Sequence, residues 1–257
     1  MKVTVLGCGP SNGVPTVIGD WGRCDPNNPK NRRRRPSIYI ELNNDTKILI
    51  DSSPDFREQA LSANIKRVDA ILFTHEHADH IMGIDDLRSI SRNMNRQISL
   101  HAEIDVLDIL LQKFGYLIEG SKDTIDNIYP PIFLPNVIRG PFKISDHTII
   151  PIEQDHGICK TLGFRIDNFA YSTDVVRFPQ RSLEQLKGLD VWILDCLRID
   201  VDHPTHAILN VVMEWIDQVR PKRTILTHMN NQTDYETLSK ILPRYVEPAY
   251  DGLVLTV

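Results

Sequence analysis

The chain of 257 residues is poor in cysteine and has no long apolar run. Its four cysteines (Cys8, Cys24, Cys159 and Cys196) are scattered without C-x-x-C spacing. This argues against a disulfide framework and favours a reducing compartment. The opening segment MKVTVLGCG has too short an apolar run for a signal peptide, and no later segment approaches a membrane span. We therefore expect a cytoplasmic protein with no membrane partner.

The chain also lacks an excess of basic residues. It has 29 basic and 34 acidic residues, for a formal net charge of −5. A long nucleic-acid footprint is therefore not expected. Hydrophobic residues make up 41% of the chain, which is enough for one substantial core. We expect one domain spanning residues 1–257.

Short apolar runs between turn residues predict a chain rich in strands. The predicted strands are 3–7, 37–42, 47–53, 68–74, 147–156, 161–167, 168–174, 189–196, 222–228 and 252–257; the predicted helices are 53–64, 83–93, 103–117 and 206–219. Residues 118–142 contain four prolines and no clean period, so we expect an irregular insertion there. Clustered strands with helices between them favour a layered α/β sandwich over a strictly alternating barrel.

The sequence FTHEHADH, residues 73–80, concentrates metal-binding side chains after an apolar strand. His75 and His77 are two residues apart at the strand end, so their side chains point the same way. Asp79 and His80 follow after the chain has turned. Imidazole and carboxylate groups are ligands of zinc and similar divalent ions. The spacing predicts that one pair serves one metal ion and the other pair a neighbouring ion.

Further ligand-type residues follow other apolar strands. His156 ends IIPIEQDH, Asp174 ends FAYSTD and His228 ends RTILTH. Each residue alone would be an ordinary strand-end residue. Their shared position after a strand predicts that they complete the metal sites.

THEHADH, a distant histidine, an aspartate after a strand and a late ILTH together resemble the metallo-β-lactamase fold superfamily. The resemblance covers nearly the whole chain and implies a four-layer αββα sandwich with a two-metal site at one edge. It matches His75, His77 and His156 to the first metal, Asp79, His80 and His228 to the second, and Asp174 to the bridging carboxylate. Glu76 occupies a variable position of the motif.

Other segments indicate which branch of the superfamily the chain resembles. An aspartate at position 174, where the best-known zinc β-lactamases carry a cysteine, disfavours lactamase activity. GCGPSNGVP (7–15), PKNRRRRPS (29–37) and DGLVLTV (251–257) resemble the PhnP-like branch, which contains phosphoribosyl 1,2-cyclic phosphate phosphodiesterase. That branch has a cysteine cluster for a structural zinc in its N-terminal loop. Only Cys24 is present here, so no structural zinc is predicted.

Further candidate residues concern catalysis and substrate binding. His206 precedes a predicted helix where the PhnP-like branch has a histidine thought to act as general acid, and imidazole suits that role. His203 is the less favoured choice. Asp79 is expected to orient the attacking nucleophile. Within NRRRRPS at least two arginines are expected to be solvated, and Arg34 and Arg35 are the candidates for contacting substrate phosphate.

The residues and the resemblance together predict a dinuclear metal-dependent phosphodiesterase acting on a small, cyclic or nucleotide-like phosphodiester. Zn²⁺ is the expected ion at both sites, with Mn²⁺ as the alternative. A homodimer is compatible with this function. The competing interpretations are a tRNA 3′-processing endoribonuclease or a thioester hydrolase of the same fold, and, from another class, an inactive metal-binding module.

Overall fold

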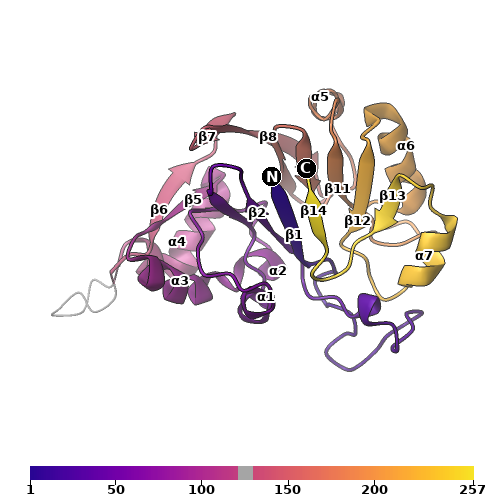
Figure 1. Ribbon diagram of the computed structural model, residues 1–257, viewed down its shortest axis with the longest axis horizontal. Helices are drawn as coiled ribbons and strands as arrows, with labels where there is room; N and C mark the ends of the chain where they lie inside the picture. The colour runs from indigo at the N-terminus through magenta and orange to yellow at the C-terminus, as the bar shows by residue number, and fades with distance from the viewer. Residues whose placement is uncertain (121–129) are drawn as a thin grey trace.

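The computed structural model describes residues 1–120 and 130–257 and contains two seven-stranded mixed sheets. The first sheet has, in spatial order, β14 (Val254–Thr256), β1 (Lys2–Gly7), β2 (Ser37–Glu41), β3 (Lys47–Ile50), β4 (Ala70–Leu72), β5 (Ile98–Ala102) and β6 (Phe133–Val137). The second has β13 (Val246–Pro248), β12 (Arg223–Thr227), β11 (Val191–Asp195), β10 (Phe169–Ser172), β9 (Lys160–Ile166), β8 (His147–Asp155) and β7 (Phe142–Ile144). Helices cover the outer faces of the two sheets (Figure 1).

The helices are amphipathic or largely buried. They are α1 (Phe56–Ser62), α2 (Ala78–Ile81), α3 (Leu87–Met94), α4 (Ile104–Ile118), α5 (Gln180–Gln185), α6 (Leu209–Val219) and α7 (Tyr235–Ile241). The longest, α4, buries Val106, Leu107, Leu110 and Leu117. No helix in the described part of the chain is long and apolar enough to cross a membrane.

Alternation of side chains along the strands builds two cores. In β3, Ile48 and Ile50 belong to the large cluster that joins the two sheets, whereas Leu49 belongs to the cluster under α1, α3 and α4. Successive residues of a strand point to opposite faces, so a strand that is apolar throughout is buried on both. The predicted αββα sandwich is confirmed.

The segment 118–142 is not irregular throughout. Phe133–Val137 form β6, which pairs in parallel with β5 and lies at the edge of the first sheet. Pro135 sits in this strand opposite Leu100, and an edge strand tolerates a residue that lacks a backbone N–H. The part of the predicted irregular insertion that falls on residues 121–129 lies outside the described residues.

Each sheet contains a parallel set of strands that end in the same direction. β3, β4 and β5 are parallel neighbours in the first sheet, and β10, β11 and β12 are parallel neighbours in the second. The His-rich motif follows β4, Asp174 follows β10 and His228 follows β12. His156 follows β8, which runs in the same direction as β10 because both are antiparallel to β9. The topology therefore brings ligand-type side chains from both sheets to one edge of the sandwich.

Candidate dinuclear metal centre

The His-rich motif forms the loop and short helix after β4. Phe73 N donates to His101 O in the neighbouring strand, so the chain stays extended to the end of the apolar run. His77 is the N-cap of α2, and Asp79 and His80 lie within that four-residue helix. This turn separates the motif into a His75–His77 pair and an Asp79–His80 pair.

The described residues form two adjacent donor sets. One set is His75, His77 and His156; the other is Asp79, His80, Asp174 and His228, and within each set the ligand atoms lie within 4.8 Å of one another. Asp174 lies between the sets. Its Oδ1 is 3.6 Å from His156 Nε2 and 3.4 Å from His228 Nε2, while its Oδ2 is 3.2 Å from His80 Nε2. This position is the one expected of a bridging carboxylate.

The donor atoms fit divalent metal ions. His75 Nε2, His80 Nε2 and His228 Nε2 are buried, and none has a hydrogen-bond partner among the described residues. Buried polar atoms without a partner are rare because each costs free energy. Several such nitrogens aimed at one carboxylate are explained by coordination, and this mixture of imidazole and carboxylate donors suits zinc.

Burial and the neighbouring carboxylates shift the pKa values of the clustered histidines in opposite directions. Burial lowers the pKa of His80, but the Asp174, Asp79 and Asp51 carboxylates outweigh it and hold that pKa well above its usual value. In the same way, burial opposes but the carboxylates raise the pKa of His228 to about 9. Burial dominates at His75 and lowers its pKa well below the usual range.

A buried carboxylate orients His80. Asp51 Oδ2 lies 2.7 Å from His80 Nδ1 and accepts a 2.9 Å hydrogen bond from Thr74 Oγ1, while Asp51 Oδ1 accepts from Thr74 N. The Thr74 hydroxyl also lies 2.9 Å from His75 Nδ1. Such partners fix the ring orientation of metal-binding histidines. One aspartate and one threonine thus align one histidine from each set.

His206 stands at the margin of the cluster with a carboxylate partner of its own. Its Nδ1 lies 2.9 Å from Asp195 Oδ2, and its Nε2 lies 3.8 Å from Asp174 Oδ1. Asp195 is wholly buried and is held by the Val175 N–H. Because a carboxylate accepts the Nδ1 proton, Nε2 is the nitrogen that faces the centre.

The backbone at the site is unusual. Asp51, Asp174 and His228 have φ angles of 60°, 55° and 59°, in the left-handed region that non-glycine residues rarely adopt. Such conformations cost on the order of 1–3 kcal/mol each and concentrate at functional sites. The fold therefore maintains a strained backbone at Asp51, which orients His80, and at the candidate ligands Asp174 and His228.

A pocket of about 200 Å³ opens beside the cluster. His206, His203 and His228 line one side, the glycine-rich loop Pro10–Gly13 lines another, and Arg198, Asn230 and Asn231 contribute polar groups. The Val14 and Arg33 backbones pair with each other and fix the base of the loop. The GPSNG segment is thus a wall of this pocket, next to the metal cluster.

All seven sequence-predicted metal ligands and His206 are brought together. Arg34 and Arg35 are not: Arg34 Nε donates to Asp251, and Arg35 forms a two-pronged ion pair with Asp55. Neither arginine lines the pocket beside the cluster. The expectation that they contact substrate phosphate is unsupported, because their guanidinium groups are already engaged by these carboxylates.

The sequence analysis assigned no role to Asp51, Asp195, Thr205 or Thr74, and Thr74 is the residue that contacts both Asp51 and His75. Asp51 follows an apolar strand and Asp195 ends one, as the predicted ligands do. Their carboxylates contact the Nδ1 atoms of His80 and His206. Thr205 O lies 2.7 Å from His156 Nδ1. Strand-end position was a usable signal for the two aspartates; nothing in the sequence marks the carbonyl of Thr205.

The fold and the cluster define the class of protein. The sequence profile of the family described as "Beta-lactamase superfamily domain" matches residues 46–229, and the chain belongs to this family. Within it, the chain has the metallo-β-lactamase fold, is PhnP-like, and gathers a cluster of histidines and aspartates that could hold metal ions.

Comparisons with individual proteins agree with this placement. The crystal structure described as "a New Diphosphatase from the PhnP Family" superimposes with a TM-score of 0.89 at 35% identity, covering 99% of this chain and 96% of that one. Zinc-bound PqqB from Methylobacterium extorquens has a TM-score of 0.76 at 18% identity and full coverage of both chains, which shows the shared fold alone. The octanoyltransferase of Porphyromonas gingivalis is 33% identical over 98% of this chain but only 51% of its own length. The chain therefore spans about half the length of that curated relative.

Proposed function

We propose that the protein is a dinuclear metal-dependent phosphodiesterase that hydrolyses a small phosphodiester, with Zn²⁺ as the ion at both positions. The observation that carries the proposal is Asp174, whose carboxylate lies between two complete donor sets, with His206 directed at the same point. Two divalent ions, when bound, would activate water and stabilise charge on the phosphoryl oxygens.

The residues of the chain then have separate tasks. Asp79 Oδ2, 3.7 Å from His228 Nε2, is placed to orient the attacking nucleophile. Asp195 holds the His206 ring through Nδ1, so Nε2 of the protonated ring faces the leaving oxygen. When the phosphorus–oxygen bond breaks, this Nε2 proton passes to the departing alkoxide and leaves His206 neutral.

The pocket beside the cluster supports a small substrate. Its volume of about 200 Å³ lies below the roughly 300–1,000 Å³ of pockets that enclose drug-sized ligands. Its polar lining suits a hydroxyl-bearing leaving group. These properties favour a small diester over the precursor tRNA of the competing endoribonuclease interpretation.

A second candidate activity is hydrolysis of a phosphoanhydride. It is favoured by the PhnP-family neighbour, which is described as a diphosphatase and is 35% identical to this chain. Both reactions break a phosphorus–oxygen bond and need the same charge stabilisation. Acyl transfer is not proposed, because half of the octanoyltransferase relative lies outside the region similar to this chain.

A substrate panel tests the proposal. The zinc-loaded protein would be assayed on a five-membered cyclic phosphodiester of a sugar, bis-p-nitrophenyl phosphate, a dinucleoside diphosphate, a thioester and a cephalosporin. Turnover of the diesters is expected, with the β-lactam left intact. Preferred turnover of the diphosphate would favour the second candidate. Turnover of the thioester or cephalosporin without phosphoesterase activity would contradict both, and no turnover by fully metal-loaded protein would favour the inactive module.

A further inference from the structure

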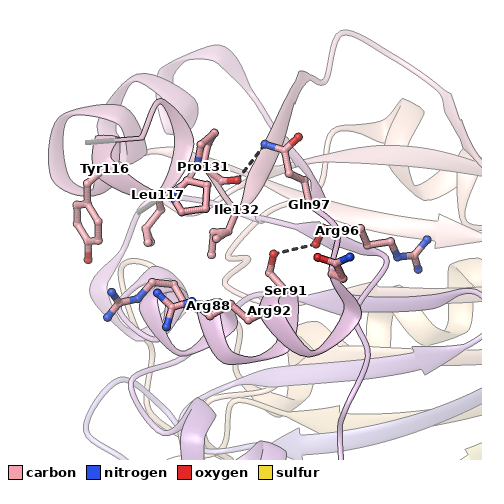
Figure 2. A pocket seen from close by; sticks show the side chains of 11 residues that line it. Arg88, Ser91, Arg92, Arg96, Gln97, Tyr116, Leu117, Pro131 and Ile132 are labelled. Atoms are coloured by element: carbon pink, nitrogen blue, oxygen red, sulfur yellow. Dashed lines mark hydrogen bonds between the residues drawn. The ribbon is translucent and has the colours of Figure 1, made fainter. Parts of the chain in front are cut away.

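A second pocket lies between α3, the end of α4 and residues 130–132 (Figure 2). It has a volume of about 220 Å³. Its lining comprises Arg88, Ser91, Arg92, Asn95, Arg96, Gln97, Tyr116, Leu117, Pro130, Pro131 and Ile132. No residue of this lining belongs to the metal cluster or to the pocket beside it.

The charge of this pocket is opposite to that of the whole chain. Its lining has three arginines and no acidic residue, in a protein with a net charge of −5. Arg88 and Arg92 are four residues apart in α3, which places them on one face of the helix, whereas Arg96 follows the end of α3. In Figure 2 the side chains of Arg88 and Arg92 reach toward the end where Tyr116 lies, whereas Arg96 extends the other way.

The arginines differ in how far they are neutralised. Arg96 pairs with Asp69, and Arg88 Nη2 donates to Asp85 Oδ2 at 2.6 Å. The guanidinium of Arg92 has no hydrogen bond or ion pair to any described residue. Its five N–H donors carry the uncompensated positive charge of the pocket.

The end of the pocket near Tyr116 is held in place. The Tyr116 hydroxyl donates to Asp85 Oδ1 at 2.6 Å, so Asp85 binds Tyr116 and Arg88 at once. Burial, with the nearby Asp85, raises the pKa of Tyr116 to about 12, which keeps the hydroxyl protonated. Only one Arg88 nitrogen is used by Asp85, and its other donors remain available beside Arg92.

The wall opposite α3 is apolar. Leu117 and Ile132 are 1% and 5% exposed, and Pro130 and Pro131 extend the same wall. An arginine pair beside an apolar wall recognises two parts of a ligand separately. Guanidinium forks match carboxylate or phosphate oxygens, and the apolar wall contributes by burying a ligand's carbon surface.

We propose that this pocket binds a small organic anion, with its carboxylate or phosphate on Arg92 and Arg88 and its apolar or aromatic body against Leu117 and Ile132. A volume of 220 Å³ equals about seven water molecules at ~30 Å³ each, which suits a small metabolite and excludes a polymer segment. This site is separate from the proposed hydrolase centre and does not depend on its chemistry.

Benzoate and phenylphosphonate test the proposal, because they carry the same body with a carboxylate or with a phosphonate that the hydrolase centre cannot cleave from its ring. Each would be titrated into the metal-loaded protein while the backbone amides of Ser91, Asn95 and Leu117 are followed by NMR. Saturable shifts at these amides are expected from at least one anion, and which one binds identifies the preferred oxyanion. Benzamide, the uncharged counterpart, should produce none.

Arginine variants provide the second part of the binding test. Arg92→Gln should raise the dissociation constant about tenfold or more, as expected for loss of charge-assisted hydrogen bonds. Arg181→Gln is the matched control, because Arg181 is an exposed arginine paired with Glu153 outside this pocket. Shifts confined to amides around the metal centre, equal binding of benzamide, or an Arg92→Gln affinity equal to that of Arg181→Gln would each overturn the proposal.

Discussion

The His206 ring is the one candidate catalytic group that is not needed to complete either donor set. His206→Ala should therefore retain both metal ions while kcat falls roughly 10²- to 10⁴-fold, as expected for loss of one acid–base group. The loss should be largest for an alkoxide leaving group such as a ribose hydroxyl. It should be smaller for p-nitrophenolate, which departs without a proton. Metal content and kcat on both kinds of diester measure this.

Asp195→Asn is the companion variant for this prediction. The neutral amide accepts the hydrogen bond from Nδ1–H more weakly than a carboxylate does, so the ring is held less firmly in its orientation. The fall in kcat of this variant should also be larger for an alkoxide than for p-nitrophenolate, but smaller than in His206→Ala. If His206→Ala were equally impaired on both leaving groups, a role in substrate binding would replace proton donation, and full activity on a cyclic diester would move the role to His203.

His101 should make stability depend on pH. Burial lowers its pKa to about 4, and its ring is stacked on Phe142 with centroids 4.7 Å apart. The unfolded chain, with a histidine pKa near 6.5, takes up the proton first, so stability present above pH 6.5 is lost as pH falls toward 4. At pH 5 the loss relative to pH 7 should be about 2 kcal/mol, by the same linkage.

Denaturant unfolding of the wild type and His101→Gln at pH 7 and pH 5 checks this. Both proteins carry the same metal ligands, so the difference between them removes the titration of the centre. The variant should lose less stability on acidification than the wild type. Equal losses in the two proteins would show that His101 does not contribute.

The residues that form the two donor sets could be predicted because metal ligation would limit the residue types and the strand ends limit their places. The orienting residues could not be assigned with the same certainty. Asp51 and Asp195 hydrogen-bond histidine rings across 29 and 11 residues of sequence, and such pairing depends on how separate strands pack. For Arg34 and Arg35, the sequence did not reveal the carboxylates of Asp251 and Asp55 that engage them, and their contact with substrate phosphate stays a prediction.

At the scale of elements, Gly83 controls the fit of α2 against the loop after β3. A Cβ at position 83 would lie 2.0 Å from Ser53 O and 2.8 Å from Phe56 Cβ. Gly83→Ala should therefore displace α2, which carries Asp79 and His80, and cost on the order of 1–3 kcal/mol through overpacking. Zinc affinity should fall together with the free energy of unfolding.

Gly115→Ala is the control for that substitution. Gly115 lies in α4, and a Cβ there would meet nothing within 4 Å. Alanine has the higher helix propensity, so this variant should be as stable as the wild type or more stable by up to about 1 kcal/mol. Chemical denaturation measures the stability of both variants, and competitive zinc titration measures their zinc affinity. Unchanged zinc affinity in Gly83→Ala would contradict the role of Gly83 in placing α2.

Strongly apolar or periodic runs were predictable, whereas several short elements were not. Residues 3–7 were expected to form a strand and lie in β1, whereas the predicted 206–219 helix begins only at Leu209 because Ile208 is extended. The four-residue α2 and three-residue β13 bury too few residues to produce a detectable period. Helix–strand packing across the sandwich determines these short elements.

Over the whole molecule, the donor sets connect the two sheets. His75, His77, Asp79 and His80 follow the first sheet, while His156, Asp174 and His228 follow the second. Ions bound to both groups should stabilise the folded chain by about 2.7 kcal/mol per site at a free concentration of 100 Kd. Chelation that removes both ions should therefore lower Tm by roughly 10–20 °C, at roughly 2–4 °C per kcal/mol for a chain near this size.

Calorimetry and elemental analysis of native, chelated and zinc-reloaded protein measure this effect. Two ions per chain are expected. His228→Ala should lose mainly one ion, and Asp174→Ala should weaken both because its carboxylate lies between the sets. A protein that takes up no metal, or a Tm that is the same with and without chelator, would refute the assignment of the centre.

The pairing of β1 with β14 brings the two ends of the chain together (Figure 1). The Met1 amino nitrogen lies 3.0 Å from Val257 O, and Val257 N donates to Met1 O at 2.9 Å. The backbone is therefore almost a closed ring. Joining the ends by a short glycine–serine linker and opening the chain at the exposed Asn44–Asp45 turn should give a circular permutant that folds and binds metal as the native chain does, measured by circular dichroism and zinc content.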